Sequence, residues 1–337
     1  MTTPSEKITQ LAVQFQTSSL IQAAGELDLF TAMIQKSAST VENLARSLNL
    51  DRRGLAVLLD GLVFLGILDK EAERYSVKAE YTELLDSRSS KTLVPMLAHW
   101  GTCQRAWSQL AHVVRTGHPA PKVAGTFGPY ADDQAFILGM NSIAGPLAAQ
   151  IAADLAAVGI TGFRQMLDLG GASGTYTLAF LRAGIAQAGV IFDRPVGIMA
   201  AQERLGRQEN EVFRNRVSLV SGDFYRDSYP PECDFHWISA IIHQQNLDAT
   251  RAMFAESYRT LDSGGTIAIR DIFVQSDPSQ TVSAAMFAVN MLVNTEAGRV
   301  YTVSETERLL TEVGFTNIRF ARKADDMTAV LVADKKV

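Results

Sequence analysis

The sequence predicts two parts, a mainly α N-terminal half and an α/β C-terminal half built on a doubly wound sheet. Apolar residues recur at helical spacing in the first part of the chain. Short apolar runs alternate with helical stretches beyond Gly162, and a glycine-rich turn follows the first of these runs. At 337 residues, 47% of them hydrophobic, the chain is long enough for two buried cores.

The N-terminal residues predict a set of short helices. Apolar residues between Glu6 and about Gln35 indicate two helices interrupted near Gly25. Ser39, with Glu42 three residues later, predicts the start of another helix, and Asp51 opens a further one that ends at Gly66. This spacing is typical of a helix-turn-helix.

Two short segments after these helices predict a hairpin. Residues 67–69 and 74–77 flank a charged turn, and together with the helices they indicate a winged-helix-like domain over residues 1–90. Acidic residues surround Arg52 and Arg53, which favours a protein-facing role over DNA binding. The apolar helices between Ile8 and Leu29 exceed the needs of so small a core, so we expect a homodimer that buries them.

The rest of the chain divides into a helical linker or lid and an α/β domain. Residues 91–160 have a helical pattern with a Gly/Pro-rich break at 117–130. Residues 161–337 contain seven strand-like runs: RQMLDLGG, GVIFD, RVSLVSGD, CDFHWISAII, GTIAIRDI, TNIRFARK and MTAVLVAD.

The first of these strands runs into a turn that suits a nucleotide. Gly170, Gly171 and Gly174 allow a ligand to approach the backbone, and a helix expected to begin near Thr175 offers free N–H groups. The glycines do not match Gly-x-Gly-x-x-Gly in either frame, which disfavours a nicotinamide-dependent oxidoreductase.

The next two strands end in acidic residues. Asp193, nineteen positions after Gly174, could accept hydrogen bonds from both ribose hydroxyls of a nucleoside. Asp223 and Phe224 could hold an adenine through a hydrogen bond and an aromatic face. Three strand ends thus converge on one adenosine-sized ligand, but composition and periodicity do not choose the cofactor.

The composition excludes several other classes of protein. A net charge of −5 provides no general attraction for nucleic acid or anionic lipid. Cys103 and Cys233 are far apart and have no Cys or His at metal-ligand spacing, so neither a disulfide framework nor a metal site is expected. Without a signal-like N-terminus or an apolar run of roughly 18 residues, we expect a cytoplasmic protein without a membrane partner.

The motifs in combination resemble those of the small-molecule O-methyltransferases, class I methyltransferases that use S-adenosylmethionine and carry an N-terminal dimerisation domain. The resemblance covers nearly the whole chain, and it is specific for the family and its cofactor but not for its substrate. It is carried by LDLGGASGTY, IFDRP, RVSLVSGDFY, AIIH, LDSGGTIAIRD, FAVNMLVNTEAGRVYT and LLTEVGF.

The resemblance implies roles for individual residues. It implies a Rossmann-like domain over 161–337 that binds S-adenosylmethionine, and His243 as the general base that removes a hydroxyl proton from a small acceptor. The implied cofactor contacts are Asp168, Gly170, Gly171, Gly174, Asp193, Arg194, Gly222, Asp223 and Phe224. Asn290, Met291 and Asn294 match a helix that lines the acceptor pocket.

Two departures from the family pattern concern the base. Gln244 and Gln245 stand where the family has an acid and, beyond it, an aromatic residue, and Val300 stands where it commonly has a glutamate. The remaining candidate to orient His243 is Asp271. A weaker base keeps open the S-methylation of a thioether acid, as on the route to dimethylsulfoniopropionate, or N-methylation, because these acceptors already offer a lone pair. A non-catalytic winged-helix regulator is the alternative of another class.

Overall fold

The structure is a computed structural model that describes residues 2–36, 38–275, 277, 279 and 281–337. It divides into two compact units, Met1–Arg105 with Lys122–Ser142 (unit 1) and Ala106–Pro121 with Ile143–Val337 (unit 2). Two helices, α7 (Val94–Trp107) and α9 (Pro129–Ala157), run from one unit into the other. Two of the three boundaries therefore fall within helices, and the third, between Pro121 and Lys122, falls in a loop.

Unit 1 begins with helices that lie close to their expected positions. They are α1 (Pro4–Val13), α2 (Phe15–Glu26), α3 (Leu29–Ile34), α4 (Val41–Leu48), α5 (Arg52–Phe64) and α6 (Thr82–Leu85), with a 3-10 turn at Ala79–Tyr81. The first stretch holds three helices, where the periodicity predicts two. Asp28 adopts a left-handed conformation (φ 47°) that separates α2 from α3.

The helix caps refine the sequence prediction. The side chain of Thr40, not that of Ser39, accepts the N–H of Asn43 at the start of α4. Ser39 instead belongs to the short strand β1 (Ser39–Thr40). Asp51 caps α5 as expected, accepting the Gly54 N–H at 2.7 Å.

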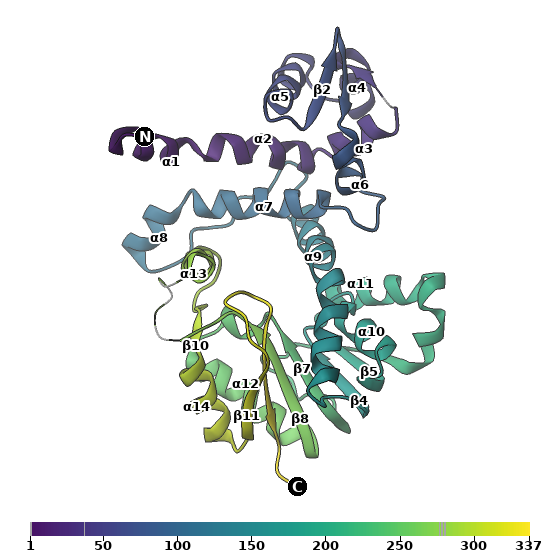
Figure 1. Ribbon diagram of the computed structural model, residues 1–337, viewed down its shortest axis with the longest axis vertical. Coiled ribbons are helices and arrows are strands. Elements are labelled where there is room, and N and C mark those ends of the chain that lie inside the picture. Colours follow the sequence, from purple (N-terminus) through teal and green to yellow (C-terminus); the bar gives the residue numbers. More distant parts are fainter. Residues whose placement is uncertain (1, 37, 276, 278, 280) are drawn as a thin grey trace. The chain divides into compact units, whose positions relative to one another are not determined.

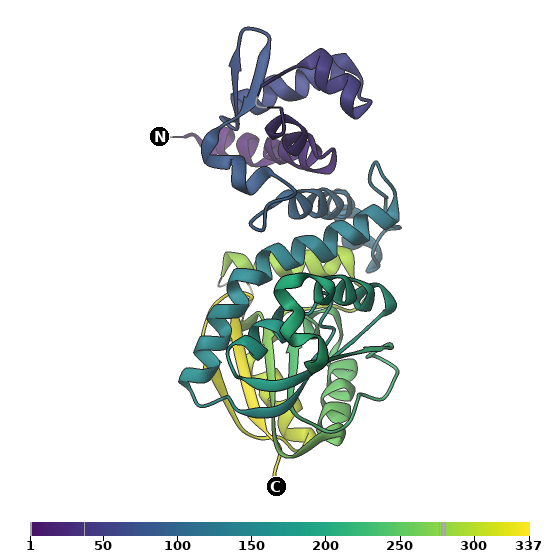
Figure 2. The same ribbon diagram turned by 90° about the vertical axis from the view of Figure 1, so that its right-hand side faces the viewer.

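A small antiparallel sheet completes this unit. Strands β2 (Leu68–Glu71) and β3 (Arg74–Val77) form the expected hairpin, visible as a pair of arrows at the top of Figure 2, and β1 pairs with β3. The hairpin packs on the helices through one apolar core that includes Phe30, Leu59 and Tyr75.

Unit 2 is built on a seven-stranded sheet in which all seven predicted runs take part. The strands are β4 (Phe163–Leu169), β5 (Ala186–Asp193), β6 (Val217–Ser221), β7 (Cys233–Ser239), β8 (Leu261–Asp271), β11 (Thr316–Arg322) and β12 (Ala329–Asp334). Their order is β11-β12-β8-β7-β4-β5-β6. The five strands from β8 to β6 run parallel to one another. Strand β12 is antiparallel to β8 and β11 is antiparallel to β12, so β11 points in the same direction as the five parallel strands.

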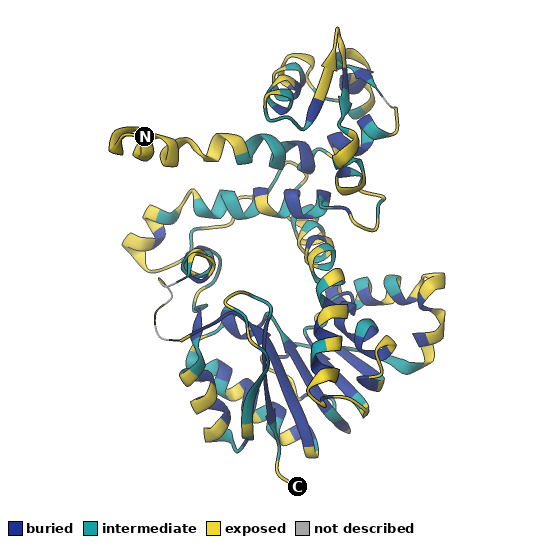
Figure 3. Cartoon of the chain, in the orientation of Figure 1, coloured by how far each residue is buried: buried dark blue, intermediate teal, exposed yellow. Residues whose placement is uncertain are grey.

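Helices cover both faces of this sheet (Figure 1). The part of α9 after Ile143, α10 (Thr175–Arg182) and α11 (Pro195–Gly206) share a core with one face. On the other face lie α12 (Leu247–Thr260) and α14 (Val303–Val313). Because both faces are covered, the central strands are continuous apolar runs, and they are buried along most of their length in Figure 3.

Three further elements of unit 2 lie near the carboxyl ends of the strands: α8 (Leu110–Thr116), α13 (Val282–Asn294) and a 3-10 turn at Ile242–Gln244. Another 3-10 turn, at Gln208–Arg216, leads into the amino end of β6. A two-residue parallel pair of β9 (Phe273–Val274) and β10 (Tyr301–Thr302), which the sequence pattern does not predict, returns the chain after α13 to the end of β8.

Helix α9 differs from one expectation. It is long and apolar enough to cross a membrane, by length and composition alone, whereas the sequence reading finds no apolar run of that length. Only 22% of its most apolar stretch is buried in the structure. The helix therefore presents apolar surface.

Candidate functional site

The glycine turn after β4 has a backbone that other residues rarely adopt. Gly170 and Gly174 have φ values of 68° and 73°. A Cβ at Gly170 would lie 2.4 Å from Cδ1 of Ile241 and 3.4 Å from the ring of Phe224. The backbone at Gly170 therefore packs directly against the side chains that follow β7 and β6, an approach that only glycine allows.

Asp168 anchors this turn to the helix that follows it. Its carboxyl accepts the hydroxyl of Thr177 at 2.6 Å and the Thr177 N–H at 3.2 Å, and the side chain is buried. Burial raises the pKa of Asp168 to about 7, although both Thr177 donors act against the rise. Gly171 leaves room for this carboxyl, since a Cβ there would lie 2.6 Å from it.

Asp193 ends β5 beside the same turn. Its carboxylate accepts the N–H of Ala172 at 2.7 Å and the N–H of Arg194 at 2.6 Å. Burial raises the pKa of Asp193, and the two N–H donors offset part of the rise. The side chain of Arg194 is exposed. Asp193 thus links the glycine turn to the start of α11, as expected if the strand ends lie close together.

The end of β6 completes this group. Gly222 donates its N–H to the Asp193 carbonyl at 3.0 Å, and a Cβ there would lie 2.4 Å from Phe192. Asp223 is partly exposed and accepts the Tyr225 N–H at 3.0 Å. Phe224 is buried against the glycine turn. The structure therefore gathers the predicted residues of the first three strand ends at one edge of the sheet.

A buried histidine and carboxylate lie at the ends of the next two strands. Nδ1 of His243 lies 2.8 Å and 3.0 Å from the two carboxylate oxygens of Asp271. Both side chains are buried, at 7% and 1% exposure. Because a carboxylate only accepts, Nδ1 carries a proton, and in the neutral ring Nε2 then has a free lone pair.

Further contacts hold this pair in place. Asp271 also accepts the N–H of Ile272 at 2.8 Å, and the His243 ring meets the edge of Phe287 with centroids 4.8 Å apart. The Arg299 N–H donates to the His243 carbonyl at 2.8 Å. Sequence reasoning missed Phe287, although it shares a face of α13 with Asn290 and Asn294 at spacings of three and seven.

The structure explains both departures from the family pattern. Gln244 contacts the Ala240 carbonyl at 3.4 Å and the hydroxyl of Tyr225 at 3.5 Å. Val300 is buried in a small apolar cluster with Ile272 and Val274. Neither position therefore supplies a carboxylate to His243, and Asp271 does.

The predicted acceptor-lining residues on α13 form one polar cluster with a partner that the sequence does not reveal. The Trp107 indole N–H donates to Oδ1 of Asn290 at 2.9 Å, and Asn294 donates to the same oxygen at 3.0 Å. Met291 is buried beside them. Trp107 lies 183 positions from Asn290, so no local pattern indicates this contact.

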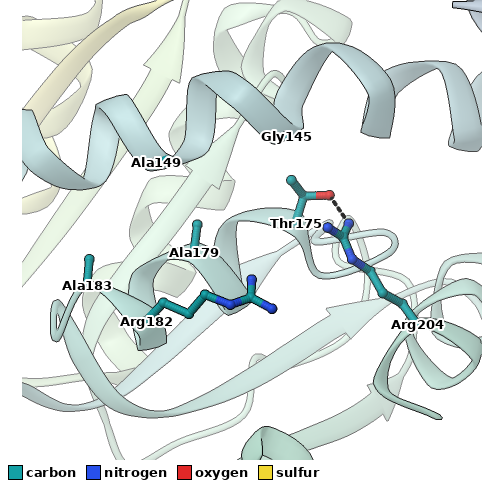
Figure 4. Close-up of a pocket in the computed structure, with 7 residues that line it drawn as sticks. All are labelled: Gly145, Ala149, Thr175, Ala179, Arg182, Ala183 and Arg204. Atoms are coloured by element: carbon teal, nitrogen blue, oxygen red, sulfur yellow. Dashed lines mark hydrogen bonds between the residues drawn. The ribbon is translucent and has the colours of Figure 1, made fainter. Parts of the chain in front are cut away.

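Two cavities lie in unit 2. The first, of about 300 Å³, is lined by α9, α10 and α11, with Arg182 and Arg204 facing small residues such as Ala149 and Ala179 (Figure 4). Arg204 donates to the Thr175 hydroxyl at 2.5 Å. The second, of about 280 Å³, lies beside Phe224 and α12. Neither includes His243.

Within the described part of the chain, no group of three or more His, Cys, Asp and Glu side chains could hold a metal ion.

Comparisons with known proteins agree over the length of the chain. Residues 107–316 match the O-methyltransferase domain, and residues 9–84 match the O-methyltransferase dimerisation domain. The chain is 30% identical to the tetracenomycin polyketide synthesis 8-O-methyl transferase TcmO of Streptomyces glaucescens, over 93% of this chain and 91% of that protein. It is 28% identical to the acetylserotonin O-methyltransferase of Gallus gallus, over 96% of each.

Solved structures share the fold. Human N-acetylserotonin methyltransferase in complex with SAM has a TM-score of 0.81 at 22% identity, covering 99% of this chain and 98% of that one. The structure of PigF with SAH has a TM-score of 0.83 at 22% identity, covering 99% and 100%. Together with the matched domains, these similarities show that the chain belongs to the S-adenosylmethionine-dependent O-methyltransferase family whose members carry a dimerisation domain.

Proposed function

We propose that this enzyme transfers the methyl group of S-adenosylmethionine to a hydroxyl of a small aromatic acceptor, with His243 as the general base. The observation that carries the proposal is the buried contact of 2.8 Å between His243 and Asp271. Aromatic acceptors are favoured because two relatives, at 28% identity, are named for methylating a hydroxynaphthoate and acetylserotonin.

The roles of the two residues follow from their chemistry. When bound, S-adenosylmethionine supplies a methyl group already activated by a positive sulfonium. Nε2 of His243 takes the proton of the acceptor hydroxyl, and the carboxylate of Asp271 keeps the ring in the required tautomer and stabilises the imidazolium that forms. Phe287 packs on the ring and excludes water from it.

The residues at the first three strand ends fit the cofactor. A nucleoside needs close backbone approach and hydrogen-bond acceptors, and the glycine turn after β4, with Gly170 and Gly174 in left-handed conformations, suits the first need. We assign the ribose hydroxyls to Asp193, the adenine to Asp223 and Phe224, and the methionine end to Gly170, Gly171 and Gly174. Asp168, Arg194 and Gly222 support this site, and Arg194 supports it with its backbone N–H.

The acceptor pocket is assigned to the cluster on α13. Asn290, Met291 and Asn294 lie on the same helix as Phe287, which contacts His243. The hydrogen bond from Trp107 fixes the orientation of the Asn290 amide. These residues would select acceptors by shape and by hydrogen bonding.

Product formation tests the proposal directly. The enzyme, S-adenosylmethionine and 2-naphthol should give 2-methoxynaphthalene by mass spectrometry, and His243→Ala should give much less. Methylation of a thioether or an amine with no product from any phenol would contradict the hydroxyl assignment. Binding of S-adenosylhomocysteine without transfer to any acceptor would favour the regulator.

The dimerisation domain supports a homodimer formed through the N-terminal helices. None of the ten described residues of α1 is buried, and its apolar residues Ile8 and Leu11 are more than half exposed. We also assign a winged-helix arrangement to α4, α5 and the hairpin, as part of the domain that dimerises.

A cytoplasmic location fits the two free cysteines, Cys103 and Cys233.

A further inference from the structure

Arg270, near the end of β8, is a buried cation with an incomplete set of partners. Its side chain is 7% exposed. Among the described residues, the Ser239 hydroxyl is its one hydrogen-bond partner, at 2.9 Å from Nη1, and Nε has none. The carboxylate of Asp271, the next residue in the chain, contacts His243 and not Arg270. A buried guanidinium without a carboxylate is costly, so its retention calls for an explanation.

Two further buried side chains that carry a donor group lie next along from Arg270: Tyr176 contacts Arg270, and Trp237 contacts Tyr176. By hydrogen-bond geometry, the Tyr176 hydroxyl and the Trp237 indole N–H have no partner within the described ranges. The Tyr176 hydroxyl is nevertheless near enough to Ser239 for that side chain to act against the rise that burial causes in the pKa of Tyr176. The guanidinium carbon lies 5.5 Å from the centroid of the Tyr176 ring, and the Tyr176 and Trp237 rings are 5.0 Å apart. Residues of α10, β7 and β8 thus form a chain of contacts from Arg270 through Tyr176 to Trp237.

The position of this cluster relates it to the cofactor site. Ser239 is the last residue of β7, lies opposite Arg270 in the strand register and is only half-buried. Tyr176 is the second residue of α10, two positions after Gly174 of the glycine turn. The cluster therefore lies at the edge of the sheet to which the parallel strands bring the predicted site residues.

A ligand that completes such a cluster must be an acceptor with negative charge. Indole and guanidinium groups only donate, a tyrosine hydroxyl can donate, and the planar guanidinium matches a carboxylate with two parallel hydrogen bonds. We propose that Arg270, Tyr176 and Trp237 form a carboxylate-binding subsite for a ligand beside the glycine turn. This inference rests on the proposed function, which supplies two sources of such a carboxylate: the cofactor's amino-acid end and an acidic acceptor.

A purely structural role for Arg270 makes a different prediction. The cation above the Tyr176 ring would then stabilise the fold, and its removal would lower the melting temperature without changing ligand affinity. A binding role predicts the reverse, because replacing a poorly compensated buried charge with an apolar side chain of similar length relieves a cost of folding.

The test compares the full-length wild type with Arg270→Met by calorimetry and thermal unfolding. Arg308→Met, on the exposed face of α14 where Arg308 pairs with Glu312, is the matched control. S-adenosylhomocysteine is titrated first, and then 5′-methylthioadenosine, which lacks the amino-acid end. To protein saturated with S-adenosylhomocysteine, 3-hydroxy-2-naphthoate and the uncharged 2-naphthol are then added.

The outcomes separate the two sources of the carboxylate. At least tenfold weaker S-adenosylhomocysteine binding by Arg270→Met, with unchanged 5′-methylthioadenosine binding and an unchanged or higher melting temperature, assigns the subsite to the cofactor. Unchanged S-adenosylhomocysteine binding, with at least tenfold weaker 3-hydroxy-2-naphthoate binding and unchanged 2-naphthol binding, assigns it to an acidic acceptor.

Other results overturn the subsite. The subsite is ruled out if Arg270→Met binds every ligand of the wild type with unchanged affinity. It is also ruled out if the substitution weakens the charged and the uncharged ligand of each pair equally. Binding of S-adenosylhomocysteine by the wild type in the same titration tests the proposed function separately. If the wild type binds none of the four ligands, both proposals are wrong.

Discussion

His243 and Asp271 are brought together from positions 28 residues apart. His243 follows β7 and Asp271 ends β8, and these two strands are parallel neighbours. One carboxylate is enough to select the tautomer that leaves Nε2 free. The absence of acids at Gln244 and Val300 therefore does not leave the histidine without an orienting group.

Substitution of either residue should lower turnover. We expect His243→Ala to reduce kcat by about 10²- to 10⁴-fold, and Asp271→Asn to reduce it in the same direction, because proton removal is impaired. The loss should shrink as the pH approaches the pKa of the acceptor, since an ionised acceptor needs no base. Steady-state kinetics across pH with 2-naphthol measure this. A kcat that is independent of pH and unaffected by either substitution would remove His243 from the role of base.

Asp168 makes a prediction about stability and pH. Its pKa is about 7 in the folded chain against an ordinary value of 3.8, so the folded state keeps a proton that the unfolded state loses. The stabilising contribution of this proton is complete below the unfolded value, falls as the pH rises from about 4 to about 7, and stays low above that.

The variant Asp168→Asn does not titrate and should escape this trend. The free energy of unfolding of Asp168→Asn, relative to that of the wild type, should rise by roughly 1–3 kcal/mol from about pH 4.5 to about pH 7. Urea unfolding at the two pH values measures it, and any constant cost of the amide cancels. Asp325→Asn, at an exposed position, should follow the wild type. Parallel behaviour of Asp168→Asn and the wild type would show that Asp168 is ionised throughout.

At the scale of elements, the glycine turn depends on both backbone conformation and space. Gly170 and Gly184 have nearly the same φ, 68° and 72°. A Cβ at Gly170 would overlap Ile241, whereas a Cβ at Gly184 would meet no described atom within 4 Å. The pair therefore separates the cost of the left-handed conformation from the cost of crowding.

Alanine at these two positions should give different results. Gly184→Ala should lower the free energy of unfolding by about 1–2 kcal/mol, the cost of a left-handed alanine. Gly170→Ala should add a further loss of roughly 1–3 kcal/mol from overlap and should also weaken S-adenosylhomocysteine binding. Chemical unfolding and calorimetry provide both numbers. Equal effects of the two substitutions on stability and on binding would argue against close packing of the turn.

At the scale of the whole molecule, the exposed apolar residues of α1 support a second copy as partner. Glutamates at Ile8 and Leu11, which are 69% and 58% exposed, should convert a dimer into a monomer, since two charges would have to be buried in the interface. Phe64→Glu is the control, at a side chain that is 89% exposed on α5. Sedimentation velocity at micromolar concentration measures the mass. A dimer that persists in the Ile8/Leu11 variant would exclude α1 from the interface.

The sequence alone determines the two-part fold, the seven strands, the glycine turn and the acidic strand ends. These features depend on interactions between residues near one another in the chain, and periodicity and turn chemistry record such interactions. The parallel sheet then places the carboxyl ends of its strands at one edge, so Asp193, Asp223 and His243 can be expected near a common ligand.

Only the tertiary structure decides which side chains become partners. The contact of Trp107 with Asn290, the packing of Val300 in an apolar cluster and the unsatisfied donors around Arg270 join segments far apart in the sequence. Their side chains meet because of the order of the strands and the packing of helices on the sheet, and the local pattern at each position is compatible with many partners. Burial then sets the energetics, because the same carboxyl or guanidinium group is ordinary in water and strongly dependent on a partner inside the protein.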